Sequence, residues 1–247
     1  MFDFLFRKKE GEMLPLPFTT DLHCHIVPGV DDGSPDLEHS LRLMERMAAW
    51  GIERIVATPH FTDVTFENSP ATIDAPFAQL QQAAQEASLG ARLIDYSFEY
   101  RLGEGFIGKL EADDLRPMPS GHILVENSFL QPLSNLDSLL FDIKLKGMRP
   151  ILAHPERYAY YHPNRKIYER LRSEEVQLQV NFLSLAGYYG RGVQELVLWM
   201  IDKGLVDYMA TDLHHQGHVE AIEKYLRSKH YKKLRPKLEL LNDCVIP

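Results

Sequence analysis

The sequence predicts an α/β fold, a distorted TIM-like (β/α)7 barrel, and two observations lead to this prediction. Seven β-like runs alternate with helix-like stretches along the 247 residues, and six of these runs end on a His, Asp or Glu side chain. All strands of a parallel β/α barrel point their carboxyl ends at one face, so side chains at those ends converge. An open doubly wound sheet gathers its ligands at a single crevice instead. Contributions from nearly every strand therefore favour the closed ring.

The order of elements follows from apolar periodicity and from cap residues. The runs begin at Thr19, Arg54, Arg92, His122, Arg149, Gln177 and Val206. Helices are expected near residues 35–50, 73–88, 133–146, 164–172, 194–203 and 219–227, with a loop or short helix at 103–115. For the first helix, Ser34 can act as the N-cap, Pro35 suits the first position and Gly51 ends the helix. Residues 1–18 are interpreted as an N-terminal arm and residues 19–247 as one domain.

Composition narrows the class of protein. Hydrophobic residues make up 45% of the chain and charged residues 25%, which is ordinary for a soluble globular protein. The formal net charge of -8 argues against nucleic-acid binding, which requires a basic face. The two cysteines, Cys24 and Cys244, form no disulfide framework and suit a reducing cytoplasm. No stretch approaches the roughly 20 apolar residues of a transmembrane helix. We therefore expect a cytoplasmic location.

Nine residues are candidate metal ligands, because His and carboxylate side chains follow strand after strand. They are His23, His25, Asp32, His60, Glu99, Glu126, His154, Asp212 and His214. His23 and His25 alternate along a run and therefore share a face, whereas Cys24 points the other way. In the following turn either Asp31 or Asp32 can reach a metal. Nine ligands are too many for one ion, so two or three ions with a bridging carboxylate fit the count.

The ligand types indicate the chemistry. His and carboxylate ligands without a thiolate suit Zn, Mn or Fe. Clustered divalent ions activate a bridging water or hydroxide as the nucleophile and bind the oxygens of a phosphoryl group. The sequence therefore predicts metal-assisted hydrolysis of a phosphoester. A cysteine-dependent tyrosine phosphatase is excluded, because that chemistry needs an arginine six residues after the cysteine, where Cys24 has Val30.

The motifs DLHCHIVPGVDDG, ATPH, SFEY, ILVE, AHPERY and ATDLH together resemble the polymerase and histidinol phosphatase (PHP) superfamily. Within it they resemble the bacterial manganese-dependent protein-tyrosine phosphatases of capsular and exopolysaccharide operons. The resemblance implies the PHP barrel fold and three divalent metals, Mn²⁺ in the first instance and Fe or Zn as alternatives. It assigns one ion to His23, His25, Glu99 and Asp212, a second to Glu99, Glu126 and His154, and a third to Asp32, His60 and His214. Asp32 is preferred to Asp31 because the family's ligand directly precedes glycine.

The resemblance also implies the substrate and further site residues. The substrate would be phosphotyrosine in the tail of a bacterial tyrosine kinase that controls polysaccharide export. Arg157, Asp212 and His214 are predicted to act in catalysis, and Arg157 also to bind substrate. The family often has an arginine after the last DxH motif, which is absent here, so His218 or Arg191 is a predicted replacement.

Several alternatives remain open at this stage. Arg157 could instead form a surface ion pair with Glu156. Tyr158, Tyr160 and Tyr161 could line an aromatic entrance or be ordinary loop residues. The protein could be a small-molecule PHP phosphatase such as a histidinol-phosphate phosphatase, or a non-catalytic regulatory module. A PHP nuclease is disfavoured by the acidic charge. The basic stretch at residues 229–237 is interpreted as a solvated face, or as a surface that attracts an acidic tail or membrane.

Overall fold

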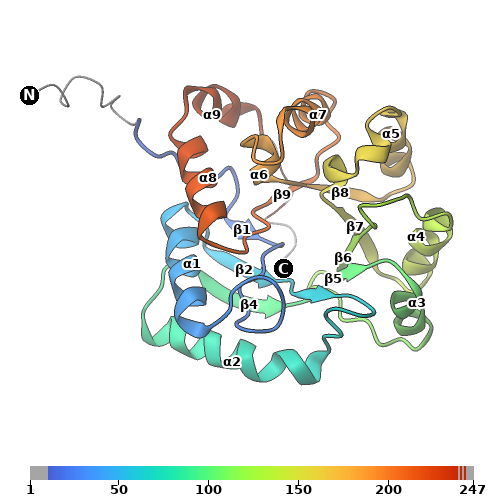
Figure 1. The fold of residues 1–247 in the computed structure, drawn as a ribbon, viewed down its shortest axis with the longest axis horizontal. Helices are drawn as coiled ribbons and strands as arrows, with labels where there is room; N and C mark the ends of the chain where they lie inside the picture. The colour runs from blue at the N-terminus through green and yellow to red at the C-terminus, as the bar shows by residue number, and fades with distance from the viewer. Residues whose placement is uncertain (1–10, 239, 241, 243–247) are drawn as a thin grey trace, which may run out of the picture.

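The computed structural model, which describes residues 11–238, 240 and 242, places a ring of parallel strands inside a ring of helices (Figure 1). The strands are β1 Thr20–Asp21, β2 Arg54–Ala57, β3 His60–Phe61, β4 Arg92–Tyr96, β5 Glu99–Arg101, β6 His122–Glu126, β7 Arg149–Ala153, β8 Gln177–Asn181 and β9 Tyr208–Ala210. They pair in the order β1-β2-β4 and β3-β5-β6-β7-β8-β9, and every pairing is parallel.

The ring closes between the first and last runs of the sequence. Cys24 forms a parallel bridge with Leu213, and the His25 amide donates to the Leu213 carbonyl at 3.0 Å. The Asp212 amide donates to the His23 carbonyl at 2.9 Å. The predicted distorted barrel is therefore confirmed.

The distortion is concentrated where two predicted runs each divide into two strands. The second run forms β2 and β3, and the third forms β4 and β5. Pro59 has no amide hydrogen and interrupts the second run. Hydrogen bonds from Ser97 N to Ala57 O (2.9 Å) and from Glu99 N to Pro59 O (3.1 Å) join the two sheets across this break. As a result, Glu99 begins a strand instead of ending one.

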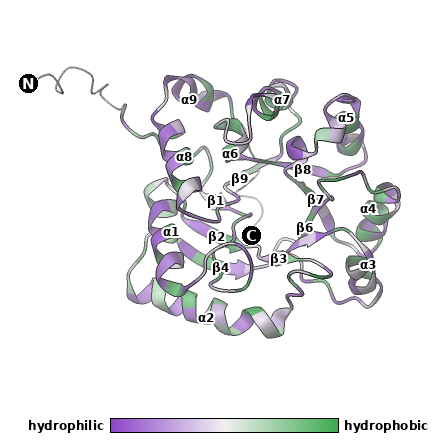
Figure 2. Cartoon of the chain, in the orientation of Figure 1, coloured by the Kyte–Doolittle hydropathy of each residue, from purple (hydrophilic) through white to green (hydrophobic). Residues whose placement is uncertain are grey.

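The helices cover the outside of the strand ring (Figure 1). They are α1 Leu37–Ala49, α2 Pro70–Glu86, α3 Glu104–Glu111, α4 Leu136–Leu145, α5 Lys166–Ser173, α6 Phe182–Leu185, α7 Arg191–Asp202, α8 Gln216–Leu226 and α9 Lys229–Leu234. Short 3-10 turns occur at η1 Pro155–Arg157, η2 Ala159–Tyr161 and η3 Arg235–Lys237. Figure 2 shows both hydrophobic and hydrophilic residues on the outer helices, as expected when one helix face packs on the strands.

The start of α1 differs from the prediction. Asp36, not Ser34, is the N-cap, and its side chain accepts from the His39 amide at 2.8 Å. The Ser34 hydroxyl donates to the Asp36 carbonyl at 3.0 Å instead. The positive end of the helix dipole also stabilises a carboxylate at this position. This explains why the N-cap lies two residues after Ser34.

The interior of the barrel is filled by a cluster distinct from the layer between strands and helices. It comprises Leu22, Val56, Met118, Leu124, Ile151, Ala153, Tyr208 and Ala210. Along β6, Leu124 joins this inner cluster while Ile123 and Val125 join the outer one. Because strand side chains alternate, His122 and Glu126 lie on the inner row with Leu124. Glu126 is therefore presented at the carboxyl end of the barrel.

The segment before β1 and the basic C-terminal stretch both pack on the barrel. Leu16 and Phe18, which fall in the predicted arm, are buried, and the Leu16 amide donates to the Trp50 carbonyl at 2.8 Å. Residues 1–10 and Cys244 lie outside the described residues. The basic stretch forms α9 and η3, and Tyr231 within α9 is buried. Among the described helices, none is both long and apolar enough to cross a membrane.

Candidate metal centre

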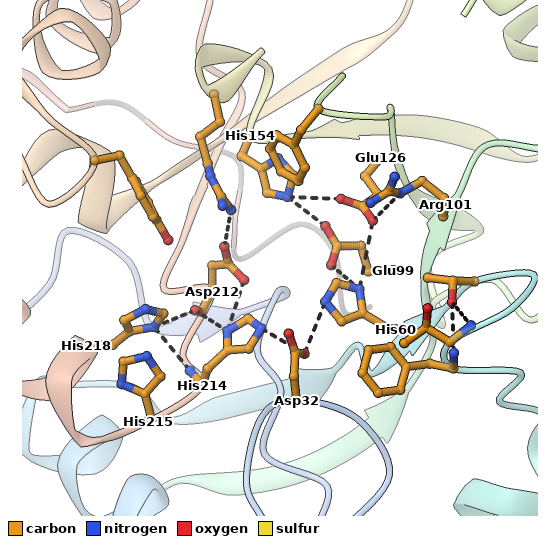
Figure 3. Close-up of a pocket in the computed structure, with 16 residues that line it drawn as sticks. Asp32, His60, Glu99, Arg101, Glu126, His154, Asp212, His214, His215 and His218 are labelled. Atoms are coloured by element: carbon orange, nitrogen blue, oxygen red, sulfur yellow. Dashed lines mark hydrogen bonds and ion pairs between the residues drawn. The ribbon is translucent and has the colours of Figure 1, made fainter. Parts of the chain in front are cut away.

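The nine predicted ligands converge at the carboxyl ends of the strands, in and beneath a cavity of about 420 Å³ (Figure 3). Four overlapping groups have their ligand atoms within 4.8 Å of one another: His25, Asp32, His60 and His214; His23, His154 and Asp212; His23, His25 and Glu99; and His60, Glu99 and Glu126. The ring closure described above brings the two ends of the sequence to the same site. Residues separated by almost two hundred positions therefore become neighbours.

Glu99 lies at the centre of the group. Its Oε2 atom is 3.3 Å from His23 Nε2, 3.4 Å from His25 Nε2 and 3.0 Å from His60 Nδ1. Its Oε1 atom is 2.7 Å from His154 Nε2. One buried carboxylate is thus shared by four imidazoles, which is the geometry expected of a bridging ligand.

Asp212 is a second carboxylate that faces His23 and His25. Its Oδ1 atom is 3.3 Å from His23 Nε2 and 3.4 Å from His25 Nε2. Its Oδ2 atom accepts from Asn181 Nδ2 at 2.6 Å and from Arg157 at 3.0 Å. These donors leave Oδ1 directed at the histidines.

The structure gives Asp31 and Asp32 different positions. Asp32 Oδ1 is 3.4 Å from His60 Nε2 and 3.6 Å from His214 Nε2, so Asp32 completes a ligand group at the mouth of the cavity. Asp31 Oδ2 lies 2.8 Å from His25 Nδ1 and accepts from the His60 amide at 3.0 Å. Asp31 therefore orients His25 from behind, away from the ligand group.

These residues fit a divalent metal. His23 Nε2, His25 Nε2 and Glu99 Oε2 are buried and have no hydrogen-bond partner. The other ring nitrogens are occupied, because His23 Nδ1 lies 2.8 Å from Gln179 Oε1 and His25 Nδ1 faces Asp31. An imidazole that donates through Nδ1 has its lone pair on Nε2. The two lone pairs and the carboxylate oxygen therefore face a common point.

The negative charge of the carboxylates in this cluster must be balanced by bound protons or by a metal cation. Burial works to lower the pKa of His23, but the carboxylates of Glu99 and Asp212 outweigh it and raise this pKa to about 9. Burial and the nearby Glu99 raise the pKa of Glu126 to about 7. The close carboxylates therefore need positive charge between them. Protonated histidines supply it in the absence of metal, and divalent ions would replace those protons.

Arg157 lies at the edge of the cavity, where its guanidinium is sandwiched between aromatic rings. Its Cζ atom is 4.7 Å from the ring centroid of Phe129 and 4.2 Å from that of Tyr189. The alternative of a surface ion pair with Glu156 is wrong, because the Glu156 carboxylate is buried and accepts from the backbone of β8. Arg157 instead pairs with Asp212, one of the candidate ligands.

The two suggested replacements for a missing arginine have different positions. The Arg191 side chain is 89% exposed, pairs with Glu195 at 2.7 Å and does not line the cavity. Its predicted role in substrate binding is therefore not supported by its position, since it begins α7 on the outer surface. His218 does line the cavity, with Nδ1 3.1 Å from the Asp212 carbonyl. Burial and the nearby His215 lower its pKa to about 4, which keeps it neutral.

The suggested aromatic entrance is made by different residues. Tyr158 is fully buried, Tyr161 is nearly so, and neither these two nor Tyr160 lines the cavity. Their hydroxyl groups instead take part in hydrogen bonds with Asn127, Ser128 and Ala153 at the end of β7. The aromatic side chains that line the cavity are Phe66, Phe129 and Tyr189.

The sequence patterns did not reveal the polar residues that form hydrogen bonds with the candidate ligands. Gln179 and Asn181 come from β8, the one run without a ligand, and Gln179 also donates to Asn181 at 2.8 Å. Their alternation in QLQVN was the available signal, since it places both on one face. Arg101, whose Nε donates to Glu126 Oε1 at 2.9 Å, was also missed.

Comparison with known proteins identifies the family. Residues 19–242 match the model of the family described as capsular polysaccharide synthesis, CpsB/CapC. The chain belongs to the CpsB/CapC family. The predicted resemblance to capsular PHP proteins is thereby confirmed.

Curated relatives of this CpsB/CapC protein carry an activity in their names. The tyrosine-protein phosphatase YwqE of Bacillus subtilis is 29% identical over 203 residues, which cover 78% of this chain and 76% of YwqE. The tyrosine-protein phosphatase CpsB of Streptococcus pneumoniae is 28% identical over 200 residues, which cover 78% of this chain and 82% of CpsB.

Solved structures show the same architecture. A structure from the work on YwqE and CpsB, described as unique metal-dependent tyrosine phosphatases, matches with a TM-score of 0.77 and 26% identity, over 88% of this chain and 90% of the other. The phosphotriesterase homology protein of Escherichia coli matches with a TM-score of 0.53 and 12% identity, over 96% of each chain. The second match shows the fold alone.

Proposed function

We propose that this CpsB/CapC family protein is a metal-dependent protein-tyrosine phosphatase. The observation that carries the proposal is Glu99, a buried carboxylate shared by four histidines beneath a cavity edged by Arg157. Such a cluster is built for cations, and an arginine beside it is suited to an anionic substrate. The relatives named tyrosine-protein phosphatases support the choice of reaction.

The proposal extends to three divalent ions, with Mn²⁺ as the metal. One group of ligands would be His23, His25, Glu99 and Asp212, a second Glu99, Glu126 and His154, and a third Asp32, His60 and His214. When bound, such ions activate a water for attack and neutralise the phosphoryl oxygens. The distances around Glu99 support its role as the ligand shared between two of these groups.

The protein's own residues would bind and orient the substrate. Arg157 offers a planar set of donors that can bind phosphoryl oxygens in pairs. Phe129 and Tyr189 on either side of it provide faces for an aromatic ring. Asp212 would serve as a ligand, because its carboxylate faces His23 and His25, and its pKa is held well below the usual range. Burial works to raise this pKa, but His23 and His214 outweigh it.

The aromatic lining favours phosphotyrosine over a small aliphatic phosphate. We propose that the physiological substrate is a phosphotyrosine protein, the tail of a bacterial tyrosine kinase in capsule production. The family description of capsular polysaccharide synthesis supports this process. Histidinol phosphate is the competing small-molecule substrate, since its hydrolysis requires the same metal chemistry.

Turnover of three substrates by the Mn²⁺-loaded protein tests the proposal. We expect kcat/KM for a phosphotyrosine peptide to exceed the values for a phosphoserine peptide and for histidinol phosphate by at least about tenfold, the factor given by roughly 1.4 kcal/mol. Asp212→Asn, which keeps the shape of the side chain, should abolish turnover of all three. Preference for histidinol phosphate would identify a small-molecule phosphatase. No turnover of any substrate would indicate a regulatory protein.

A further inference from the structure

Arg101, at the end of β5, is a second arginine in the cavity. Among the described residues, Arg101 and Arg157 are the only lysine or arginine side chains that line it. Figure 3 shows Arg101 beside Glu126, with Asp212 on the other side of Glu99 in this view. Arg101 therefore lies beside one candidate ligand carboxylate of the cavity, as Arg157 lies beside another.

The two arginines are held in the same way. Arg101 donates through Nε to Glu126 Oε1 at 2.9 Å, and Arg157 donates through one terminal nitrogen to Asp212 Oδ2 at 3.0 Å. Each guanidinium is thus fixed by one hydrogen bond to a candidate ligand carboxylate. A guanidinium has five N–H donors, so most donors of each group remain available.

The ring of Phe129 lies near both guanidinium groups. The Arg101 Cζ atom lies 5.9 Å from the centroid of this ring, and the Arg157 Cζ atom lies 4.7 Å from it. The Arg101 side chain is 34% exposed and the Arg157 side chain 24% exposed. Both groups are therefore immobilised, partly desolvated and still accessible to a molecule in the cavity.

We propose that Arg101 is a further substrate-binding residue, which binds the phosphoryl group of the substrate together with Arg157. This inference rests on the proposed phosphatase function and deepens it by naming a second anion-binding group. Two fixed guanidinium groups that line the same cavity as the candidate metal ligands can hold a dianionic phosphoryl group in one orientation. A neutral or singly charged ester would use only part of this binding surface. Arg101 thus contributes to specificity for phosphate monoesters.

Binding of inorganic phosphate to the Mn²⁺-loaded protein tests the role of Arg101 without turnover. Arg101→Gln keeps a donor for Glu126 but removes the charge. We expect this variant to retain the wild-type manganese content and to bind phosphate roughly tenfold or more weakly in calorimetry, as for loss of a charged hydrogen bond. Arg101→Lys should recover only part of the affinity, because an ammonium lacks the planar fork.

Kinetics with two substrates separate binding of the phosphoryl group from binding of the peptide. Arg101→Gln should lower kcat/KM by a similar factor for p-nitrophenyl phosphate and for a phosphotyrosine peptide. The matched control is Arg170→Gln, since Arg170 pairs with Asp137 and Glu174 on the surface away from the cavity. This control should match the wild type in phosphate affinity and kinetics.

Three results would overturn the assignment of Arg101. Unchanged phosphate affinity in Arg101→Gln would remove the binding role. A fall in manganese content would show that Arg101 acts only by positioning Glu126. A loss confined to the peptide substrate would assign Arg101 to the peptide. Failure of the proposed function is distinguishable, because the wild type would then not hydrolyse phosphotyrosine, while calorimetry would still measure the role of Arg101 in phosphate binding.

Discussion

At the scale of single residues, each central histidine has one ring nitrogen held by a neighbour and the other directed at the cluster. Gln179 holds His23, Asp31 holds His25, and the Asp212 carbonyl lies 2.9 Å from His214 Nδ1. Such contacts fix both the ring orientation and the nitrogen that carries the proton. The candidate metal centre is therefore preorganised by neighbouring side chains and by one backbone carbonyl.

Gln179 provides a direct test of this preorganisation. Gln179→Leu keeps the size of the side chain but removes the oxygen that faces His23. We expect Mn²⁺ affinity to fall 10–100-fold, as is typical when an outer hydrogen bond to a ligand is lost. Titration with Mn²⁺ measures the change. Gln82→Leu, at an exposed position on α2, is the control and should bind as the wild type does. Equal affinities for both variants would show that Gln179 does not orient His23.

Substitution of Arg157 distinguishes substrate binding from metal binding. Arg157→Ala should keep the metal content but lower kcat/KM for a phosphotyrosine peptide. Loss of one charged contact in a largely desolvated site costs on the order of 2–4 kcal/mol of transition-state stabilisation. Arg157→Lys should restore part of the activity, because it returns the charge without the fork. An alanine variant with wild-type kcat/KM would show that Arg157 has no role in the reaction.

The sequence predicted the candidate ligands that the structure gathers in one place, but not the residues that act through neighbours. His-x-His and DxH spacing identified both members of each pair, because alternation on a strand fixes their common face. Phe129 and Arg101 gave no such signal, since their roles depend on loops and strands that meet only after folding. The suggestion that Tyr158 lines an aromatic entrance was wrong, because an aromatic residue next to a site motif is as readily buried as exposed.

At the scale of elements, the order of strands and helices followed from periodicity, whereas their ends did not. Pro59 interrupts the second run, and the third run divides where its backbone pairs with the second across this break, so the division depends on pairing between strands. The N-cap of α1 is Asp36 and not Ser34, because the Asp36 side chain accepts the hydrogen bond from the His39 amide. Periodicity reports which face of an element is buried, and the ends are decided by local hydrogen bonds.

Strand β6 carries titratable groups at both ends of its inner row, and His122 lies at the end remote from the metal centre. Its Nδ1 is 2.7 Å from Ser120 Oγ and its Nε2 is 3.2 Å from the Tyr208 hydroxyl. Burial, aided by Arg149, lowers the pKa of His122 from 6.5 to about 4. Between these pH values the unfolded chain binds a proton that the folded protein does not. The free energy of unfolding should therefore fall as pH decreases through this window.

His122→Gln should remove this dependence on pH. From the size of the pKa shift, the wild type should lose about 2 kcal/mol more than the variant between pH 7 and pH 4.5. Urea denaturation of both metal-free proteins at the two pH values measures the difference, and titration of the metal ligands is common to both. Parallel losses in the two proteins would show that His122 is not buried in its neutral form.

At the scale of the whole molecule, the metal centre depends on closure of the barrel. The His23, Asp212 and Leu213 backbones join the first run to the last. Asn242, from the end of the described chain, donates to the Thr20 and Met209 carbonyls at 2.9 and 2.6 Å and ties β1 to β9 near their start. The closed ring was predictable because ligands on six of seven runs need a common face. The contribution of Asn242 was not, since a single Asn near a chain end has no distinguishing pattern.

Because the ligands extend from His23 to His214, metal binding should stabilise the entire fold. Ions that bind only the folded state add about 2.7 kcal/mol per site at a hundredfold excess over Kd. For a protein of this size, 1 kcal/mol corresponds to roughly 2–4 °C in Tm. We therefore expect chelation to abolish phosphatase activity and to lower Tm by about 5–10 °C or more, and Mn²⁺ to restore both. Glu99→Gln removes the shared carboxylate charge and should show a much smaller Mn²⁺-dependent shift. An identical Tm for the wild type with and without Mn²⁺, together with full activity after chelation, would refute the metal requirement.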